Sequence, residues 1–361
     1  MQAATREVGS KTLLQSATSQ SLGANSPVAI YPEHIQSLAV AMEKAIENIV
    51  RQGQINEALV KRLLVLEQRV AELTQRLVSH GSRSATSATE ISPAPTAGSV
   101  PSAITAKDPL PMYVGGSIAM CRVLNSFRMY VDTKDTMFTP QLLLSGIWEP
   151  ALTRFFMQSL KSGMTVVDVG ANVGYYTLLA AASVGTTGRV IAFEPEPRNL
   201  EILERNLELN GLRECVTVCG KAVLNERRTL DLHQNPRNRG AHTLFLTDPA
   251  NSPFQRIKVE TIALDDAIDR PVDFMKIDAE GSEPLIFQGM KKTLARNPQL
   301  KIMMEFNTVT LKNAGVDPSD FLASLGKLGF TMRVVTPQAT LVAAHEQSLL
   351  SQQLSTLLLT R

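Results

Sequence analysis

The fold of this 361-residue chain is decided by the stretch "TVVDVGANVGYYTLLAAA", residues 165–182. It begins as an apolar, strand-like run and ends as a helical pattern, with Gly170 and Gly174 in the turn between them. A strand, a glycine turn and a helix in this order are typical of nucleotide-binding α/β folds. The stretch therefore predicts a ligand site at the turn, and its neighbours indicate which ligand.

The turn differs from a dinucleotide-binding loop at two residues. Asn172 stands where the middle glycine of G-x-G-x-x-G would let the backbone approach a pyrophosphate. Asp168 precedes the first glycine, and a carboxylate there would repel phosphate groups. It would suit a cationic ligand that carries an amino group and no phosphate. S-adenosylmethionine, with its sulfonium centre, is such a ligand.

The next strand-like run supports this interpretation. It ends at Glu194 and Pro195, in "IAFEPEP", where an acid is placed to accept hydrogen bonds from ribose hydroxyls. Asp168 alone would pass for a helix cap and Glu194 alone for a solvated strand end, but the two together favour a cofactor site. The predicted cofactor-binding residues are Asp168, Gly170, Ala171, Asn172, Gly174, Glu194, Pro195 and, in the third run, Ala222.

Apolar runs and helical patterns alternate through the second half of the chain. The runs are 165–170, 189–194, 216–223, 273–278 and 301–306, and the helical patterns are 173–184, 197–210, 284–296 and 318–328. This alternation predicts an open, doubly wound α/β sheet. The shorter pieces "RTLDLH", "HTLFLT" and "IKVETI" suggest an antiparallel excursion at the edge of the sheet or above its C-terminal rim. The tail predicts a strand, a short helix and a final strand.

Four segments together carry a family resemblance. They are "GMTVVDVGANVGYYT", "AFEPEPRNLEILERNLELNG", "VDFMKIDAEGSEPLIFQGM" and "IMMEF". Over roughly residues 145–361, about the size of one domain, the chain resembles the FkbM family of S-adenosylmethionine-dependent methyltransferases. The resemblance implies a Rossmann-like class I methyltransferase fold, with a seven-stranded, mostly parallel sheet and one late antiparallel strand, in a domain over 110–361. It also implies methyl transfer to an oxygen, on a sugar or glycan hydroxyl or on another polar metabolite.

A second group of candidates lies in "MKIDAEGSE", at and beyond the end of the fourth long run. In open α/β sheets ligands bind at such strand ends. Asp278 and Glu280 are the candidate general bases, and the choice between them stays open. Lys276 would steady a neighbouring carboxylate or orient a hydroxyl. Glu283 would either contact the substrate or begin the next helix, where an acid is favoured by the helix dipole.

Three further residues are weaker candidates. Glu305, at the end of "KIMMEF", and Asn307 would contact the substrate or cap a helix. His242 lies in "RGAHTLF", a segment that in the family tends to sit over the active site, and it would be either catalytic or simply hydrogen-bonded. The single tryptophan, Trp148, is expected to be a core anchor. No fixed ligand spacing gives a positive reason for a metal.

The N-terminal third has a different texture. Residues 1–30 are polar and without a period, which predicts disorder, and 79–109 read as a flexible linker. Between them, 31–78 follow a heptad repeat from Ile35, with only Gln52 and Asn56 polar among the core positions. This predicts a coiled coil and a homo-oligomer through 35–78, with a dimer favoured by Asn56. A helix folded onto the catalytic domain and a different partner protein are the alternatives.

Composition narrows the class of protein. The 36 Lys and Arg residues nearly balance the 34 Asp and Glu residues, so bulk charge favours neither nucleic acid nor an anionic membrane. No apolar run reaches a membrane span of about 20 residues, no secretory segment is evident, and the three cysteines lack disulfide or zinc spacing, so a cytoplasmic location is expected. A nicotinamide-dependent oxidoreductase and a non-enzymatic scaffold with a degenerate domain are the rival functions.

Overall fold

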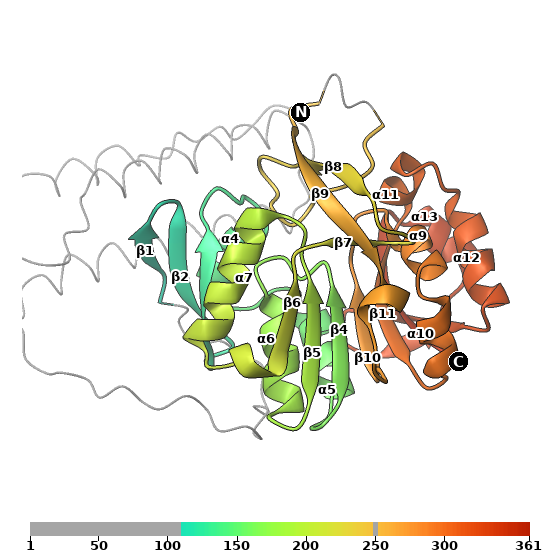
Figure 1. The fold of residues 1–361 in the computed structure, drawn as a ribbon, viewed down its shortest axis with the longest axis horizontal. Coiled ribbons are helices and arrows are strands. Elements are labelled where there is room, and N and C mark those ends of the chain that lie inside the picture. The colour runs from blue at the N-terminus through green and yellow to red at the C-terminus, as the bar shows by residue number, and fades with distance from the viewer. Residues whose placement is uncertain (1–109, 248–251) are drawn as a thin grey trace, which may run out of the picture. The chain divides into compact units, whose positions relative to one another are not determined.

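The computed structural model describes residues 110–247 and 252–361, all of which fall in one compact unit (Figure 1). The predicted disordered segment 1–30, the coiled coil 31–78 and the linker 79–109 lie outside the described residues. The described residues include every motif that carries the resemblance to methyltransferases.

An eight-stranded sheet forms the centre of the fold, in the order β13-β12-β14-β11-β10-β4-β5-β6. Its strands are β4 (Thr165–Val169), β5 (Arg189–Phe193), β6 (Val216–Cys219), β10 (Phe274–Ile277), β11 (Lys301–Asn307), β12 (Thr331–Val335), β13 (Leu341–Ala343) and β14 (Leu354–Thr360). From β6 to β11 all neighbours pair in parallel. The chain progresses outward from β4 in one direction and from β10 in the other, so the order reverses between these two strands. Ligands of such sheets bind at the carboxyl ends of the strands at this switch point.

The predicted mostly parallel sheet is confirmed, and so is the late antiparallel strand, β14, which pairs antiparallel with both β11 and β12. The sheet has one strand more than the seven expected. The chain turns back after β12 through Ala339, whose φ is 60°, and Thr336 accepts and donates hydrogen bonds across that turn. This turn lets the short strand β13 pair with β12 at the edge of the sheet.

Two hydrophobic cores lie on the two faces of the sheet, because successive side chains of a strand alternate between faces. In β4, Val166 packs in one core, and Val167 and Val169 pack in the other. The first core contains residues of α4 (Phe138–Ser145), α5 (Pro150–Ser159), α6 (Tyr175–Val184) and α7 (Pro197–Leu209). The second contains residues of α8 (Leu264–Ala267), α9 (Glu283–Gln288), α10 (Lys291–Arg296), α11 (Thr308–Asn313), α12 (Pro318–Lys327) and α13 (Glu346–Ser351).

The helix predicted over 284–296 is two helices, α9 and α10, separated at Gly289 and Met290. A Cβ on Gly289 would lie 2.3 Å from the carbonyl oxygen of Leu224, so a neighbouring strand passes too close for any side chain there. The other long helices begin within two residues of the predicted positions.

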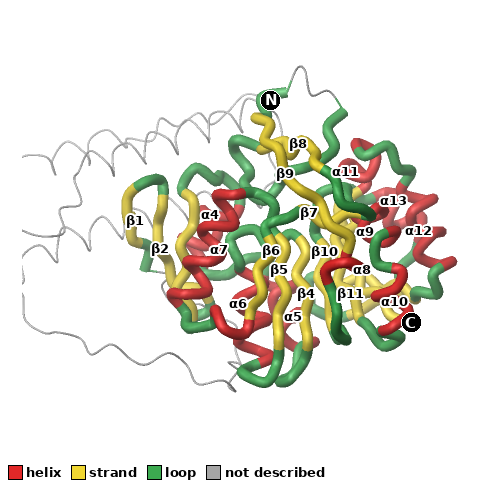
Figure 2. The backbone as a smooth tube through the Cα atoms, in the orientation of Figure 1, coloured by secondary structure: helices red, strands yellow, loops and turns green. Residues whose placement is uncertain are grey.

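Two small sheets accompany the central one. The first is antiparallel and consists of β1 (Met112–Gly115), β2 (Ile118–Val123) and β3 (Phe127–Asp132). The second consists of β7 (Ala222–Leu224), β8 (Thr229–Gln234) and β9 (Gln255–Ala263) and lies beyond the C-terminal ends of β4, β5 and β6 (Figures 1 and 2). A single 3₁₀ turn, Arg213–Cys215, precedes β6. The excursion above the C-terminal rim is thereby confirmed.

Two parts of that excursion differ from expectation. The run 216–223 is not one strand, since the chain leaves the main sheet at Gly220 and continues as β7, which pairs with β9. The piece 242–247 is not a strand either. Thr243 bridges His233, but its hydroxyl bonds to the carbonyl oxygens of Phe245 and Glu280, which turns the backbone away from a ladder.

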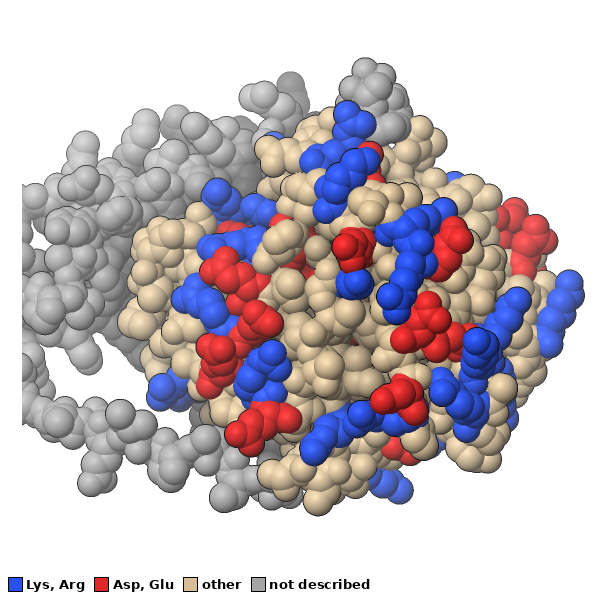
Figure 3. Space-filling view, in the orientation of Figure 1, with Lys and Arg blue, Asp and Glu red and all other residues tan. Residues whose placement is uncertain are grey.

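The surface carries both signs of charge. On the face shown in Figure 3, Lys and Arg are interspersed with Asp and Glu, without a large patch of one sign. Among the helices of residues 110–247 and 252–361, none has the length and apolarity needed to cross a bilayer. The three cysteines are free thiols.

Candidate functional site

The glycine loop, residues 170–174, joins β4 to α6 at the switch point. Gly170, Asn172 and Gly174 have φ values of 78°, 51° and 92°, which is the left-handed region. Glycine adopts it freely and asparagine at lower cost than most residues. The amides of Gly170 and Ala171 donate to the carbonyl oxygen of Phe193, at 3.1 and 3.0 Å, which fixes the loop to the end of β5.

Glu194 follows β5 directly and holds the same loop through its side chain. Its Oε2 accepts from the amide of Asn172 at 2.8 Å, and its Oε1 accepts from the amide of Glu196 at 2.9 Å. Burial raises the pKa of Glu194 to about 7. A carboxylate oxygen has two lone-pair directions, so each oxygen retains capacity for a hydroxyl. Pro195, half-buried, follows it.

Asp168 is fully buried near the end of β4, opposite Lys276 of β10. Its Oδ2 accepts from the hydroxyl of Thr177 at 2.6 Å, and its Oδ1 lies 3.8 Å from the ammonium of Lys276. Burial raises the pKa of Asp168, while Lys276 and Thr177 oppose the rise. The side chain has no exposed surface, and the cofactor contact expected of it stays a prediction.

Lys276 is the basic centre of the site. Its Nζ donates to Asp278 Oδ2 at 3.1 Å and lies 5.1 Å from the ring centroid of Tyr176. Burial alone would lower the pKa of Lys276, but Asp278 and Asp168 outweigh it and the pKa is raised. Lys276 is therefore a fixed cation that holds two carboxylates.

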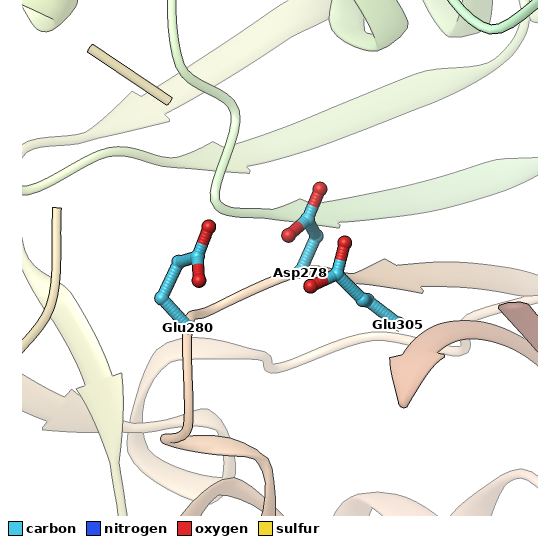
Figure 4. A group of neighbouring side chains, drawn as sticks. All are labelled: Asp278, Glu280 and Glu305. Carbon is cyan, nitrogen blue, oxygen red and sulfur yellow. The ribbon is translucent and has the colours of Figure 1, made fainter. Parts of the chain in front are cut away.

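The acid cluster consists of Asp278, Glu280 and Glu305, each half-buried. One carboxylate oxygen from each lies within 4.8 Å of the others. Figure 4 shows these side chains converging from the turn after β10 and from β11. Burial, and then the charge of Asp278, raise the pKa of Glu280 to about 8 and that of Glu305 well above its usual value. Glu280 and Glu305 therefore keep protons that isolated glutamate side chains would lose.

Glu283 holds the turn that carries this cluster. Its oxygens accept from the amides of Ala279 and Gly281, at 2.9 and 3.0 Å, and the residue is buried. Glu280 and Gly281 in that turn have φ values of 50° and 97°. These bonds, and the start of α9 at Glu283, fit the interpretation that this acid begins the helix.

Asn307 and Glu305 lie at the end of β11. The side-chain oxygen of Asn307 accepts from the amides of Val309 and Thr310 and so caps α11, which is the capping role considered for it. Its Nδ2 donates to Glu305 Oε1 at 3.4 Å. Asn307 therefore reaches the acid cluster through Glu305.

His242 lies in a crossing segment, residues 234–243, that connects the two halves of the site. Burial, and then Arg239, lower its pKa to about 4, and its Nδ1 accepts from the amide of Asn235 at 2.9 Å. The ring is thus neutral, with its proton on Nε2. The next residue, Thr243, donates to the carbonyl oxygen of Glu280 at 2.8 Å.

The other end of the crossing segment reaches the glycine loop. A Cβ on Gly240 would lie 3.2 Å from the side-chain nitrogen of Asn172. The amide of Arg239 donates to Asp135 Oδ2 at 2.6 Å, and its carbonyl accepts from Asn199 at 3.0 Å. The crossing segment therefore links the glycine loop to the turn of the acid cluster.

Ala222 stays a predicted cofactor-binding residue, and Glu149 is an acid that the sequence analysis did not single out. Ala222 is buried in β7 and pairs with Thr261 rather than with the central sheet. Glu149 was not predicted, yet its Oε2 accepts from the hydroxyl of Tyr176 at 2.8 Å. In the sequence it is only an acid before a proline, which is typical of a helix start. Trp148 packs edge-on against Phe138, at 5.1 Å between centroids, as expected of a core anchor.

Comparison with known proteins confirms the family resemblance. Residues 168–332 match the model of the methyltransferase FkbM domain. Methyltransferase 1 of Beauveria bassiana is 27% identical over 146 residues, which are 35% of this chain and 57% of that protein. A protein-L-isoaspartate O-methyltransferase of Thermotoga maritima is 34% identical over 74 residues, which are 20% of this chain and 23% of that protein. The chain thus spans from about a quarter to just over half the length of these relatives.

Solved structures of methyltransferases are also similar. The methyltransferase FkbM of Methylobacillus flagellatus matches with a TM-score of 0.36 and 15% identity, over 62% of this chain and 55% of that one. An O-methyltransferase of Bacillus cereus in complex with SAH matches with a TM-score of 0.34 and 16% identity, over 58% of this chain and 79% of that one.

Proposed function

We propose that this chain, which carries an FkbM methyltransferase domain at residues 168–332 with S-adenosylmethionine as its cofactor, methylates a hydroxyl oxygen of a polar small molecule or glycan. The observation that carries the proposal is the acid cluster beside the glycine loop at the switch point of the sheet. The acceptor class rests on the family resemblance and on the capacity of carboxyl groups to bind hydroxyls.

The residues around the loop fit a cationic cofactor. Glu149, Asp168, Asp278, Glu280 and Glu305 provide carboxyl groups, and Lys276 is their basic neighbour. A site with this excess of carboxyls disfavours phosphates and favours a sulfonium and an ammonium. Glu194 would accept hydrogen bonds from ribose hydroxyls, and the amides of the glycine loop would line the nucleoside. When bound, S-adenosylmethionine supplies an electrophilic methyl group on sulfur.

The residues of the chain would position the acceptor and take its proton. Glu280 is the general base that we favour, because a pKa of about 8 makes its carboxylate more basic than an ordinary one. Asp278, held by Lys276, would accept a hydrogen bond from the acceptor and fix its orientation. Glu305 would share the proton with Glu280. Most of the rate enhancement would come from this positioning, since base assistance typically contributes about 10²–10⁴-fold.

A ligand screen followed by an acceptor screen tests the proposal. The full chain is expected to gain thermal stability with S-adenosylmethionine and S-adenosylhomocysteine and not with NAD. Methyl transfer from labelled cofactor would then be measured on a panel of sugars, glycans and hydroxylated metabolites, with their deoxy counterparts as matched controls. Stabilisation by NAD alone would replace the proposal by an oxidoreductase, and transfer to the deoxy compounds would rule out a hydroxyl acceptor.

A further inference from the structure

The carboxylate of Glu149 is not used by the helix that it precedes. Glu149 is the N-cap of α5, but its side chain accepts no hydrogen bond from the first turn of that helix. An acid at this position ordinarily caps the helix. Glu149 instead has a φ of 42° and a ψ of 68°, a left-handed conformation that is strained for a residue with a side chain. The carboxylate therefore does not cap α5.

The carboxylate is directed toward the start of α6. Its Oε2 accepts from the hydroxyl of Tyr176, in the first turn after the glycine loop. The preceding residue is held at the same place, because the amide of Trp148 donates to the hydroxyl of Tyr175 at 3.2 Å. That hydroxyl also bonds to Thr153 of α5 at 3.0 Å. These contacts fix Glu149 at the junction of the glycine loop and α6.

Tyr176 also connects Glu149 with the charged centre of the site. Its ring lies under the ammonium of Lys276, and Lys276 in turn holds Asp168 and Asp278. Burial, and then the charge of Asp278, raise the pKa of Glu149. Glu149 is thus linked to Asp278 through Tyr176 and Lys276, and the negative charges of the two carboxylates repel each other.

Lys276 relieves part of this repulsion, because it donates to Asp278 Oδ2 and its charge lowers the pKa of Glu149. A further cation beside Glu149 would relieve the rest. Glu149 is half-buried, so a ligand can reach it, and within residues 110–247 and 252–361 it forms no ion pair with a basic side chain. Asp168, the acid expected from the sequence to serve the cofactor, has no exposed surface and is held by Thr177 and Lys276.

We infer that Glu149 binds the α-ammonium group of the amino-acid end of S-adenosylmethionine. Asp168 contributes to the site only indirectly, through its ion pair with Lys276. The inference rests on the proposed function, because it requires this cofactor. The ammonium donates to the Glu149 carboxylate, while Tyr176 keeps the carboxylate oriented. Charge-assisted hydrogen bonds of this kind are about twice as strong as neutral ones.

Binding of two ligands that differ only in the amino group tests the inference. They are S-adenosylhomocysteine and its deamino analogue, in which hydrogen replaces the amino group and the carboxylate is kept. Calorimetry on the full chain is expected to show that Glu149→Gln weakens S-adenosylhomocysteine binding by about ten- to a hundredfold and leaves the analogue nearly unchanged. Glu208→Gln, at an exposed position of α7, is the matched control and should alter neither affinity.

Each alternative outcome has a distinct meaning. If Glu149→Gln preserves the wild-type ratio of the two affinities, the inference is wrong, even where both affinities fall. If wild-type protein binds neither ligand, the cofactor assignment itself fails. Retained binding of the analogue shows that the variant is folded. Should Glu149→Gln not fold, Tyr176→Phe removes the hydroxyl that orients the carboxylate and should lower the same ratio, whereas an unchanged ratio would contradict the inference.

Discussion

Gly170 is required at its position for two separate reasons. Its φ of 78° is left-handed, and a Cβ would lie 1.8 Å from the carbonyl oxygen of Asp278. With alanine, the left-handed backbone would lower the free energy of unfolding by about 1–2 kcal/mol. The overlap of its Cβ with Asp278 would force the glycine loop away from the turn of the acid cluster. We expect Gly170→Ala to lower the free energy of unfolding by more than about 3 kcal/mol and to abolish cofactor binding, as measured by urea unfolding and calorimetry.

Gly315→Ala is the matched control for this substitution. Gly315 has a φ of 74°, close to that of Gly170, but no atom lies within 4 Å of the position that a Cβ would take there. It should show only the cost of the backbone conformation, about 1–2 kcal/mol, with normal cofactor binding. Equal losses of stability in the two variants would mean that the approach to Asp278 is unimportant.

Glu280 gives the proposed reaction a pH dependence. A general base works only when it is deprotonated, and burial and Asp278 raise the pKa of Glu280 to about 8. The rate at saturating substrates should therefore rise with pH through about 7–9 and then level. Glu280→Gln should lower kcat by about 10²-fold or more and remove this limb of the profile. A variant that keeps the limb would shift the role of base to Asp278 or Glu305.

The candidate site was only partly predictable from its residues. Strand ends rich in acids identified Asp278, Glu280 and Glu194, because parallel strands bring their carboxyl ends to one edge. The sequence does not reveal that Asp168 faces Thr177 and Lys276, since the first contact depends on how α6 packs on β4 and the second on the register of β4 against β10. Glu149 was missed because its left-handed backbone contradicts the helix-cap pattern that its neighbours suggest.

The crossing segment, residues 234–243, is held in place by Asp135. The Oδ1 of Asp135 accepts from the amides of Met137 and Thr139, and its Oδ2 accepts from the amide of Arg239. Asp135→Asn keeps one oxygen but places an amide group opposite the Arg239 N–H. We expect a loss of about 1–3 kcal/mol in stability and about tenfold weaker S-adenosylhomocysteine binding, measured by urea unfolding and calorimetry.

Asp265→Asn is the comparison for Asp135→Asn. Asp265 also accepts two backbone amides, those of Lys292 and Thr293, at the start of α10. Asp265→Asn should lower the free energy of unfolding by a similar amount without weakening the binding of S-adenosylhomocysteine. A parallel loss of affinity in both variants would show that general destabilisation, rather than release of the crossing segment, explains the effect of Asp135→Asn.

The strands of the central sheet and the long helices that pack on it were predictable, because their hydrophobic patterns are regular. The excursion that contains β7, β8 and β9 was predictable only in part. In the run 216–223 the only local signal between β6 and β7 is Gly220 followed by Lys221, and an isolated glycine inside a strand pattern does not tell a bulge from the end of the strand. The division arises from tertiary pairing, since β9 offers β7 a parallel partner outside the main sheet. Likewise, the close passage of Leu224 over Gly289 divides the helix predicted over 284–296. Such contacts between distant segments leave no periodic trace in the sequence.

Buried acids should also make the stability of the whole domain depend on pH. Burial raises the pKa of Glu194 and Glu283 to about 7, above the value of about 4.3 for an unfolded glutamate. Between these values the folded state binds more protons than the unfolded state, so this contribution to stability falls as the pH rises from about 4.5 to 7.5. Urea unfolding at several pH values should show the decline, and Glu283→Gln should flatten it. Stability that rises across this range in both proteins would contradict the role of these carboxyls.

Self-association is a separate prediction, carried by the heptad repeat at 35–78, which lies outside the described residues. A narrow apolar seam of this length buries little in a single helix, so pairing with a second copy is the natural way to cover it, and Asn56 in the seam favours a parallel dimer. Light scattering should give the full chain about twice its monomer mass of 39.3 kDa, and a chain beginning at residue 110 the monomer mass for its length. Glutamate in place of Leu63 and Leu66, which lie in the seam, should reduce the intact chain to its monomer mass. Glutamate in place of Ala71 and Gln75, which lie outside the seam, should leave the dimer mass unchanged. If the full chain and the shortened chain contain the same number of copies, the coiled-coil prediction is wrong, and where that number is two, association belongs to residues 110–361.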